Sequence, residues 1–187
     1  MNLDQIHKVE LPFGIVKEVR AWKKACDEIK NSPLAHLKAH DNEGTRTNHY
    51  QTSVPISLIE PSYWLPFTLR LCAQLYGGSH RNYYLRKNEG HFDGYDLWIN
   101  YSYKGNSNPE HWHLGCLSGV IFLKNKDETI FTKSNVKVVG KPGEMLLFPS
   151  DTMHMVKPQK KNYERITFAF NIHRKNLSWC LTKIVLI

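Results

Sequence analysis

Residues 165–172 read Arg-Ile-Thr-Phe-Ala-Phe-Asn-Ile, and this stretch alternates between two kinds of side chain. Successive side chains of a β-strand point to opposite faces of the sheet, so the isoleucines and phenylalanines share one face. The arginine, threonine, alanine and asparagine share the other face. We expect the bulky face to pack against helices and the small, polar face to line the inside of a barrel. A polar interior costs free energy unless something binds there, so the stretch predicts a binding site.

The second half of the chain contains further short apolar runs that indicate strands. Turn residues such as Gly140-Lys141-Pro142-Gly143 separate these runs. The expected strands are 97–103, 117–123, 128–132, 136–139, 144–148, 154–156, 165–172 and 179–186. We expect Trp98, Trp112 and Phe122 to lie in the core.

The first half of the chain has the spacing of amphipathic helices. Apolar residues recur every three or four positions between Gly14 and Lys30, and Asn31-Ser32-Pro33 ends this pattern. A second helix is expected from about Pro61 to Tyr76, with Leu65, Leu69, Cys72 and Tyr76 as its apolar face. Residues 40–58 are polar and indicate a loop that leads into a short extended piece.

Helices followed by many short strands predict a mainly β protein with N-terminal helices, of the α+β class. The expected architecture is a double-stranded β-helix, a cupin-like jelly roll buttressed by helices. We expect one domain over 1–187, with helical support and loops in 1–95 and the β-helix core in 96–187. A chain of 187 residues is long enough to bury a substantial core.

Composition sets limits on location and partners. The four cysteines lack CxxC spacing, which argues against a cysteine zinc site or a disulfide framework and favours reduced, cytosolic thiols. No apolar run is long enough to span a membrane, and the N-terminus lacks the features of a secretory signal. We therefore expect a cytoplasmic protein, in the host cytoplasm if it is viral. The formal charge of +8 comes from dispersed lysines, so nucleic acid is the less favoured partner.

A candidate metal site is indicated by His111-Trp112-His113 together with the later His154. Two histidines at positions i and i+2 of a strand face the same side. A third histidine on a later strand completes a facial set of ligands and leaves positions open for a co-substrate and O2. Arg165 follows, and a guanidinium offers the rigid fork that binds a carboxylate.

The residues around these histidines carry a specific combination of short motifs. Trp98-Ile99-Asn100 is followed by the His-x-His pair and by Ser118-Gly119-Val120. A Gly-x4-Phe-Pro-x4-His run then ends at His154, and an Arg-x-Thr pair begins at Arg165. In this combination the chain resembles the iron(II)- and 2-oxoglutarate-dependent oxygenases, most closely a bacterial and phage group with a His-x-His motif. The resemblance covers residues 96–173.

The resemblance implies a double-stranded β-helix that uses Fe(II), 2-oxoglutarate as co-substrate, and O2. In such enzymes oxidative decarboxylation of 2-oxoglutarate gives succinate, carbon dioxide and an oxidant that usually hydroxylates a C–H bond. Carried over to this chain, the resemblance makes His111 the first metal ligand and His154 the distal one. It makes Arg165 the carboxylate-binding arginine and Thr167 the helper hydroxyl. Asn100 is a further candidate for holding the co-substrate or an iron-bound water.

His113 departs from the family pattern, because most relatives have Asp or Glu at this position. Three neutral imidazoles leave one more positive charge at iron than two imidazoles and a carboxylate, which should weaken iron binding. Glu110 is out of phase with the histidines, and Asp151 lies in the turn before His154. A rival His91-Phe92-Asp93 has the literal family form but lies between glycines. The working hypothesis is therefore a triad of His111, His113 and His154.

The expected function is an iron(II)- and 2-oxoglutarate-dependent hydroxylase of a peptide or protein residue or of a small molecule. The alternative is a cupin-like metalloprotein that uses the three histidines without 2-oxoglutarate. A third hypothesis, a basic module that binds nucleic acid without catalysis, rests on the charge alone.

Overall fold

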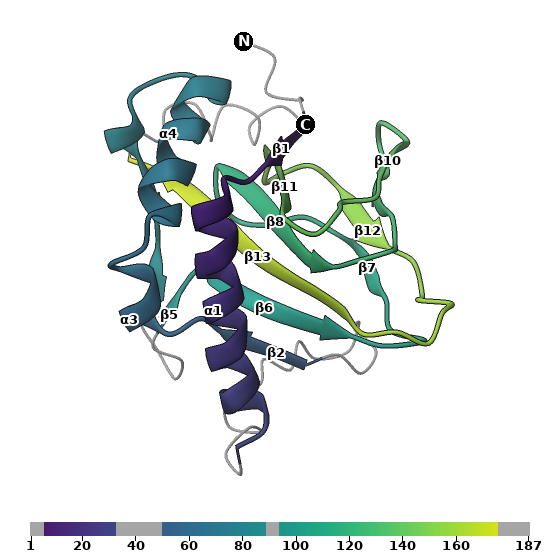
Figure 1. Ribbon diagram of the computed structural model, residues 1–187. Helices are drawn as coiled ribbons and strands as arrows, with labels where there is room; N and C mark the ends of the chain where they lie inside the picture. Colours follow the sequence, from purple (N-terminus) through teal and green to yellow (C-terminus); the bar gives the residue numbers. More distant parts are fainter. Residues whose placement is uncertain (1–5, 33–49, 89–93, 176–187) are drawn as a thin grey trace.

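The strand β13 (Arg165–Arg174) lies at the centre of the larger of two facing antiparallel sheets (Figure 1). The computed structural model describes residues 6–32, 50–88 and 94–175. The strands of the larger sheet are, in spatial order, β1 (His7–Glu10), β11 (Glu144–Pro149), β8 (Leu117–Lys124), β13, β6 (Leu97–Ser102) and β2 (Tyr50–Ser53), with β3 (Tyr83–Leu85) also paired to β13. The smaller sheet has the order β10 (Val136–Val138), β9 (Thr129–Phe131), β12 (His154–Val156) and β7 (Asn108–His111). A separate ribbon pairs β4 (Lys87–Asn88) with β5 (Gly94–Tyr95).

This arrangement confirms the predicted mainly β jelly roll with supporting helices. Seven of the eight predicted strands form within one or two residues of their expected ends. The eighth, at 179–186, lies outside the described residues. The strands β1, β2 and β3 come from the N-terminal half and join the larger sheet. β2 falls in the short extended piece expected within residues 40–58, whereas the sequence patterns did not indicate β1 and β3.

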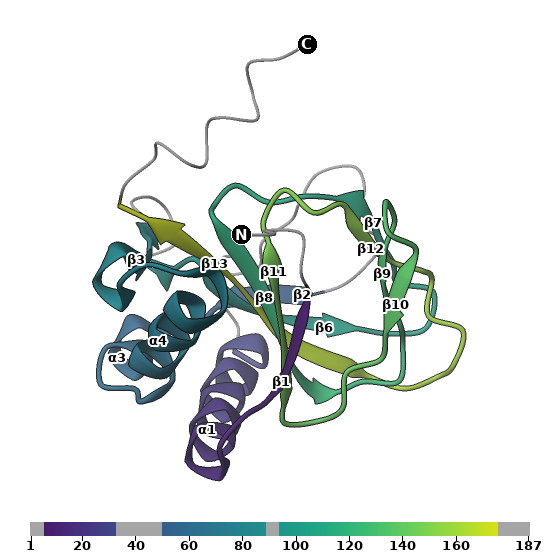
Figure 2. The ribbon, with the colours of Figure 1, turned by 90° about the horizontal axis from the view of Figure 1, so that it is seen from above.

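The helices cover the outer face of the larger sheet, as Figure 2 shows from above. They are α1 (Phe13–Lys30), α3 (Ile56–Ile59), α4 (Trp64–Tyr76) and a short 3-10 helix, η1 (His80–Asn82). Trp22 of α1 packs edge-on against Trp64 of α4 at a centroid distance of 5.5 Å, and Trp64 meets Phe170 of β13 at 5.0 Å. The apolar face of β13 is buried in this core, as its alternation predicts. Within the described ranges, no helix combines the length and apolarity needed to cross a bilayer.

The helix α4 begins three residues later than expected and buries a partly different set of side chains. Its buried residues are Trp64, Thr68, Cys72 and Tyr76, whereas Leu65 and Leu69 are only half-buried. The large indole of Trp64 fits between Trp22 and Phe170, which turns the helix so that this ring faces the sheet.

Two cysteines lie inside the core between helices and sheet. Cys26 of α1 and Cys72 of α4 are fully buried. Burial raises the pKa of each thiol to about 12. Both are therefore protonated thiols at neutral pH, as expected for cysteines with a packing role.

Gly119 of β8 allows the ring of Phe170 to lie directly against the strand. A Cβ atom at this position would lie 2.1 Å from that ring, which is far inside van der Waals contact. Replacing Gly119 with Ala is therefore expected to lower the free energy of unfolding by about 1–3 kcal/mol through overpacking. Urea unfolding followed by circular dichroism measures this change. Gly14→Ala is the matched control, because a Cβ at Gly14 would have no other atom within 4 Å and alanine favours a helix. An equal loss in both variants would contradict the packing explanation.

The C-terminal end of α1 is tied to the sheet by a partly buried carboxylate. Glu164 accepts hydrogen bonds from the hydroxyl of Tyr103 at 2.9 Å and from Nζ of Lys30 at 3.2 Å. Burial alone would raise the pKa of Glu164, but these two bonds outweigh it and the pKa is lowered from 4.5. The carboxylate therefore stabilises the fold above about pH 4.5, and this contribution is lost as the pH falls through the lowered pKa.

Acid lowers the free energy of unfolding. We expect this decrease to be smaller in Glu164→Gln than in the unaltered chain. The measurement is urea unfolding between pH 3 and pH 7, where the variant should be less stable than the unaltered chain at pH 7 and should approach it at pH 3. Glu28→Gln, on the exposed side of α1, is the control that should keep the original acid dependence. If the free energy of unfolding changes with pH in the same way in the unaltered chain and in Glu164→Gln, this carboxylate does not contribute to the acid dependence.

Candidate metal centre and co-substrate pocket

A pocket opens between the two sheets, on the polar face of β13. It has a volume of about 670 Å³ counted to its open mouth. The larger sheet contributes Gln51, Trp98, Asn100, Ser102, Val120, Arg165, Thr167 and Ala169 to its wall. The smaller sheet and the connecting segments contribute Asn106, Ser107, Asn108, His111, His113, Asp127, Thr129, His154, Val156 and Gln159. The small and polar face of β13 thus lines a cavity, as the alternation predicts.

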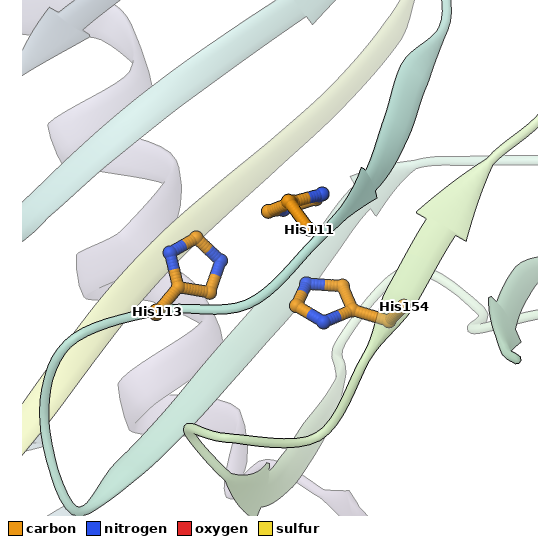
Figure 3. Close-up of side chains that lie close together, drawn as sticks. All are labelled: His111, His113 and His154. Atoms are coloured by element: carbon orange, nitrogen blue, oxygen red, sulfur yellow. The ribbon is translucent and has the colours of Figure 1, made fainter. Parts of the chain in front are cut away.

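The three predicted histidines meet in this pocket. One ring nitrogen from each of His111, His113 and His154 lies within 4.8 Å of the other two. The ring centroids are separated by 4.2–5.2 Å. Figure 3 shows the three rings converging, with His111 and His154 on strands and His113 on the segment that follows β7. Three imidazoles at this spacing can hold a single divalent transition metal.

Two of the imidazoles are oriented by backbone carbonyl groups. Nδ1 of His111 donates to the carbonyl oxygen of Pro109 at 2.7 Å, and Nδ1 of His154 donates to that of Thr152 at 2.8 Å. A carbonyl can only accept, so each Nδ1 carries the proton and each Nε2 presents its lone pair. This is the tautomer that a metal ligand needs, and such a bond fixes the orientation of the ring.

His113 reaches the cluster from a loop, whereas the sequence argument placed it on the same strand as His111. β7 ends at His111, and His113 lies beyond it in the loop. Its backbone N–H donates to the carbonyl of Ser150 at 2.9 Å, which ties the loop to the turn before β12. The side chain of Ser150 in turn meets Ser118 at 2.9 Å, and Ser118 donates to Asn171 at 2.8 Å. A buried polar network therefore holds the loop of His113 against the larger sheet.

Two of the tryptophans predicted as core are not in it. Trp112 is 53% exposed, and Trp98 is half-buried in the pocket wall with its ring 6.0 Å from that of His113. Phe122 is fully buried, as predicted. It lies with Phe131, Leu146 and Phe148 in a small apolar cluster inside the barrel, and Phe148 packs edge-on against His154 at 4.9 Å.

The metal cluster contains no carboxylate among the described residues. Glu110 and Asp151, the two substitutes that the sequence suggested, are exposed. The rival His91-Phe92-Asp93 lies outside the described residues. The three-histidine set is therefore the one that the geometry supports.

Arg165 places a buried positive charge in the same pocket. It is 7% exposed, and its Nε donates to Oδ1 of Asn125 at 2.8 Å. Burial lowers the pKa of this guanidinium, while the nearby Asp127 opposes the shift. No carboxylate of the described residues lies within 4.0 Å of Arg165 to form an ion pair. A buried cation of this kind can bind an anion.

Thr167 and Asn100 lie beside Arg165 on the pocket floor. They are register partners across β13 and β6, and Gln51 of β2 is the next residue in the row. Nε2 of Gln51 donates to Oδ1 of Asn100 at 2.5 Å, so this bond engages the amide oxygen of Asn100. Gln51, Asn108, Asn125 and Thr129 were not singled out from the sequence, because polar residues on short strands have no distinctive spacing.

Three buried polar atoms of the pocket lack a hydrogen-bond partner among the described residues. They are Oδ1 of Asn108, Oγ1 of Thr129 and Oε1 of Gln159. Buried polar atoms are almost always bonded, so their gathering in one pocket indicates a polar occupant. The donor set of three imidazoles fits iron(II), and Arg165 with the hydroxyl groups of Thr129 and Thr167 fits a dicarboxylic acid.

Comparison with known proteins agrees with this geometry. Residues 125–171 match a family model described as "Putative 2OG-Fe(II) oxygenase", where 2OG is 2-oxoglutarate. The matched segment contains His154, Arg165 and Thr167, whereas His111 and His113 precede it. A search of curated proteins gives no significant match.

Solved structures with a similar fold include oxygenases of this kind. A prolyl-4-hydroxylase of Pseudomonas putida is 16% identical, with a TM-score of 0.62 over 92% of this chain and 94% of that one. A viral collagen prolyl hydroxylase of Paramecium bursaria Chlorella virus-1, bound to 2-oxoglutarate, is 16% identical, with a TM-score of 0.56 over 89% and 94%. HygX of Streptomyces hygroscopicus, with nickel and 2-oxoglutarate bound, is 10% identical, with a TM-score of 0.60 over 92% and 84%. The segment that carries His154, Arg165 and Thr167 thus matches the sequence model of a 2OG-Fe(II) oxygenase family, and the chain shares its fold with these solved oxygenases.

Proposed function

We propose that the chain is an iron(II)- and 2-oxoglutarate-dependent oxygenase of the hydroxylase type. The observation that carries this proposal is the meeting of three histidines and one buried arginine in a single pocket. When bound, iron(II) with 2-oxoglutarate and O2 supplies the oxidant, and 2-oxoglutarate is converted to succinate and carbon dioxide.

The residues of the chain have distinct parts in this proposal. His111, His113 and His154 hold the metal through one face and leave the opposite positions open. Arg165 binds the far carboxylate of 2-oxoglutarate, and Asn125 fixes its guanidinium by accepting from Nε, so the terminal nitrogens are left to form a fork. Thr167 and Thr129 offer hydroxyl groups in the same pocket. We also propose that Asn100, which lines the same pocket, holds the co-substrate or a bound water.

The direct test is an anaerobic mixture of the purified chain with iron(II) and 2-oxoglutarate. The proposal expects a visible metal-to-ligand charge-transfer band that needs all three components. Admission of air should then bleach the band and release succinate. Folded protein that gives neither the band nor succinate would overturn the proposal.

A second candidate is favoured by one observation, the imidazole of His113 where relatives have a carboxylate. It is a cupin-like metalloprotein that uses the three histidines without 2-oxoglutarate. The hydrogen bonds of His111 and His154 to neutral carbonyl groups do not restore the missing negative charge at the metal. This candidate expects a metal-dependent activity that 2-oxoglutarate does not change.

The substrate class that we propose is a peptide or protein residue or a small molecule. The prolyl hydroxylases among the structural neighbours support the first, and HygX, which has been solved with hygromycin B, supports the second. Trp112 and Leu114, both exposed, flank His113 and offer apolar contacts near the metal. Nucleic acid remains the less favoured class, and we propose a cytoplasmic location.

A further inference from the structure

Asn108, the first residue of β7, stands next to the metal cluster without a role in the triad. Its Nδ2 lies 3.3 Å from Nε2 of His111, and it lines the same pocket. Its Oδ1 is buried and has no hydrogen-bond partner among the described residues. A buried amide oxygen without a partner is costly, so the present orientation of this amide is unfavourable, and a half-turn would point the oxygen at the cluster instead.

A β-bulge brings Asn108 to the same side as His111. Residues three apart on a regular strand face opposite sides of the sheet. Here His154 pairs with His111, and Val156 pairs with Asn108. Two steps along β12 therefore match three steps along β7, so β7 contains one extra residue. Bulges of this kind redirect side chains beside functional sites.

The separation of Asn108 and His111 is that of neighbouring metal ligands. Two donors at about 2.1 Å from one metal and at right angles are about 3 Å apart. A half-turn of the carboxamide exchanges Nδ2 and Oδ1, which places the amide oxygen close to the position that Nδ2 has now. Amide oxygens are common ligands of divalent cations.

We propose that Asn108 is a fourth protein ligand of the metal, bound through Oδ1 beside His111. The proposal rests on the metal site of the proposed function. Asn108 would give the metal an oxygen donor. In most relatives a carboxylate at the position of His113 supplies such an oxygen. A neutral amide oxygen would be a weaker ligand than a carboxylate, so it could leave the metal more readily when a co-substrate or another small ligand binds.

The test is an anaerobic titration of the full chain with cobalt(II), whose visible spectrum reports the number of ligands. Asn108→Ala is expected to weaken cobalt(II) binding by at least about tenfold and to change the spectrum towards lower coordination number. Asn108→Asp, which adds a charged oxygen, is expected to bind more tightly than the unaltered chain. Asn31→Ala, an exposed asparagine at the end of α1 that does not line the pocket, is the matched control and should bind within about twofold of it. Circular dichroism of each metal-free variant checks that it is folded.

A change in cobalt(II) affinity opposite to the one expected for Asn108→Ala would contradict the proposal. If Asn108 merely occupies the lone pair of His111, its removal would leave cobalt(II) binding unchanged or make it tighter, and the proposal would be wrong. An unaltered chain that binds no cobalt(II) would overturn this proposal together with the metal site. A chain that binds the metal but not 2-oxoglutarate would overturn only the oxygenase proposal, since the comparison of metal affinities needs no co-substrate.

Discussion

Arg165→Ala is expected to raise the concentration of 2-oxoglutarate needed for half-maximal succinate formation by about 100-fold or more. Removing one partner of a buried charged pair typically costs 2–5 kcal/mol, and about 1.4 kcal/mol corresponds to tenfold. The guanidinium is 7% exposed and has no ion-pair partner among the described residues, so water screens its interaction with a bound carboxylate only weakly. The measurement is a succinate assay over a range of 2-oxoglutarate concentrations, together with a metal titration.

Metal affinity distinguishes a lost carboxylate contact from a damaged fold. Arg165→Ala should bind metal as the unaltered chain does, because Arg165 is not in the histidine cluster. Arg165→Lys should restore only part of the affinity for 2-oxoglutarate, since an ammonium lacks the planar fork. Arg20→Ala, at an exposed position of α1, is the control for loss of an arginine. Unchanged activity in Arg165→Ala would favour the three-histidine metalloprotein that does not use 2-oxoglutarate.

His113→Ala is expected to weaken iron(II) binding by at least about 100-fold. Loss of a residue that only hydrogen-bonds to a metal ligand typically weakens metal binding by about 10–100-fold, and loss of a ligand itself should cost more. His113→Asp is expected to bind iron(II) at least as tightly as the unaltered chain, because a carboxylate removes one positive charge from the centre. Anaerobic titration with iron(II) against a competing chelator measures both. His80→Ala, at an exposed histidine, serves as the control.

These two variants decide whether the third imidazole is a ligand. Equal affinity in His113→Ala and the unaltered chain would show that His111 and His154 hold the metal without it. If His113→Asp binds iron(II) no more tightly than His113→Ala, the loop that Ser150 ties down does not bring the shorter side chain into reach.

The fold was predictable from the sequence wherever one face of a strand is buried. The alternation in 165–172 identified both faces of β13, since burial against the helices enforces period two. β1 and β3 are short and have no such run, and they are held by pairing with strands far away in the sequence. Their positions depend on tertiary contacts that a local pattern does not contain.

The meeting of the three histidines was predictable from the sequence, but the backbone path that brings His113 to the others was not. His111, His113 and His154 meet as the motif predicts, yet His113 arrives from a loop. Trp112 was expected in the core but is exposed. The outer face of β7 belongs to the smaller sheet, which the helices leave uncovered, so an outward side chain meets solvent (Figure 2). Asn108 was missed because the bulge that redirects it appears only in the pairing with β12.

The burial of Cys26 and Cys72 has a chemical consequence as well as a structural one. Sulfur is oxidised mainly as the thiolate, and with pKa values of about 12 almost none is present at neutral pH. A protein that activates O2 is exposed to its own reactive by-products, and these two sulfurs are shielded from them by packing. This protection lasts only while the helices remain packed on the sheet. The rate at which the two thiols react with an added thiol reagent would therefore report how often the core opens.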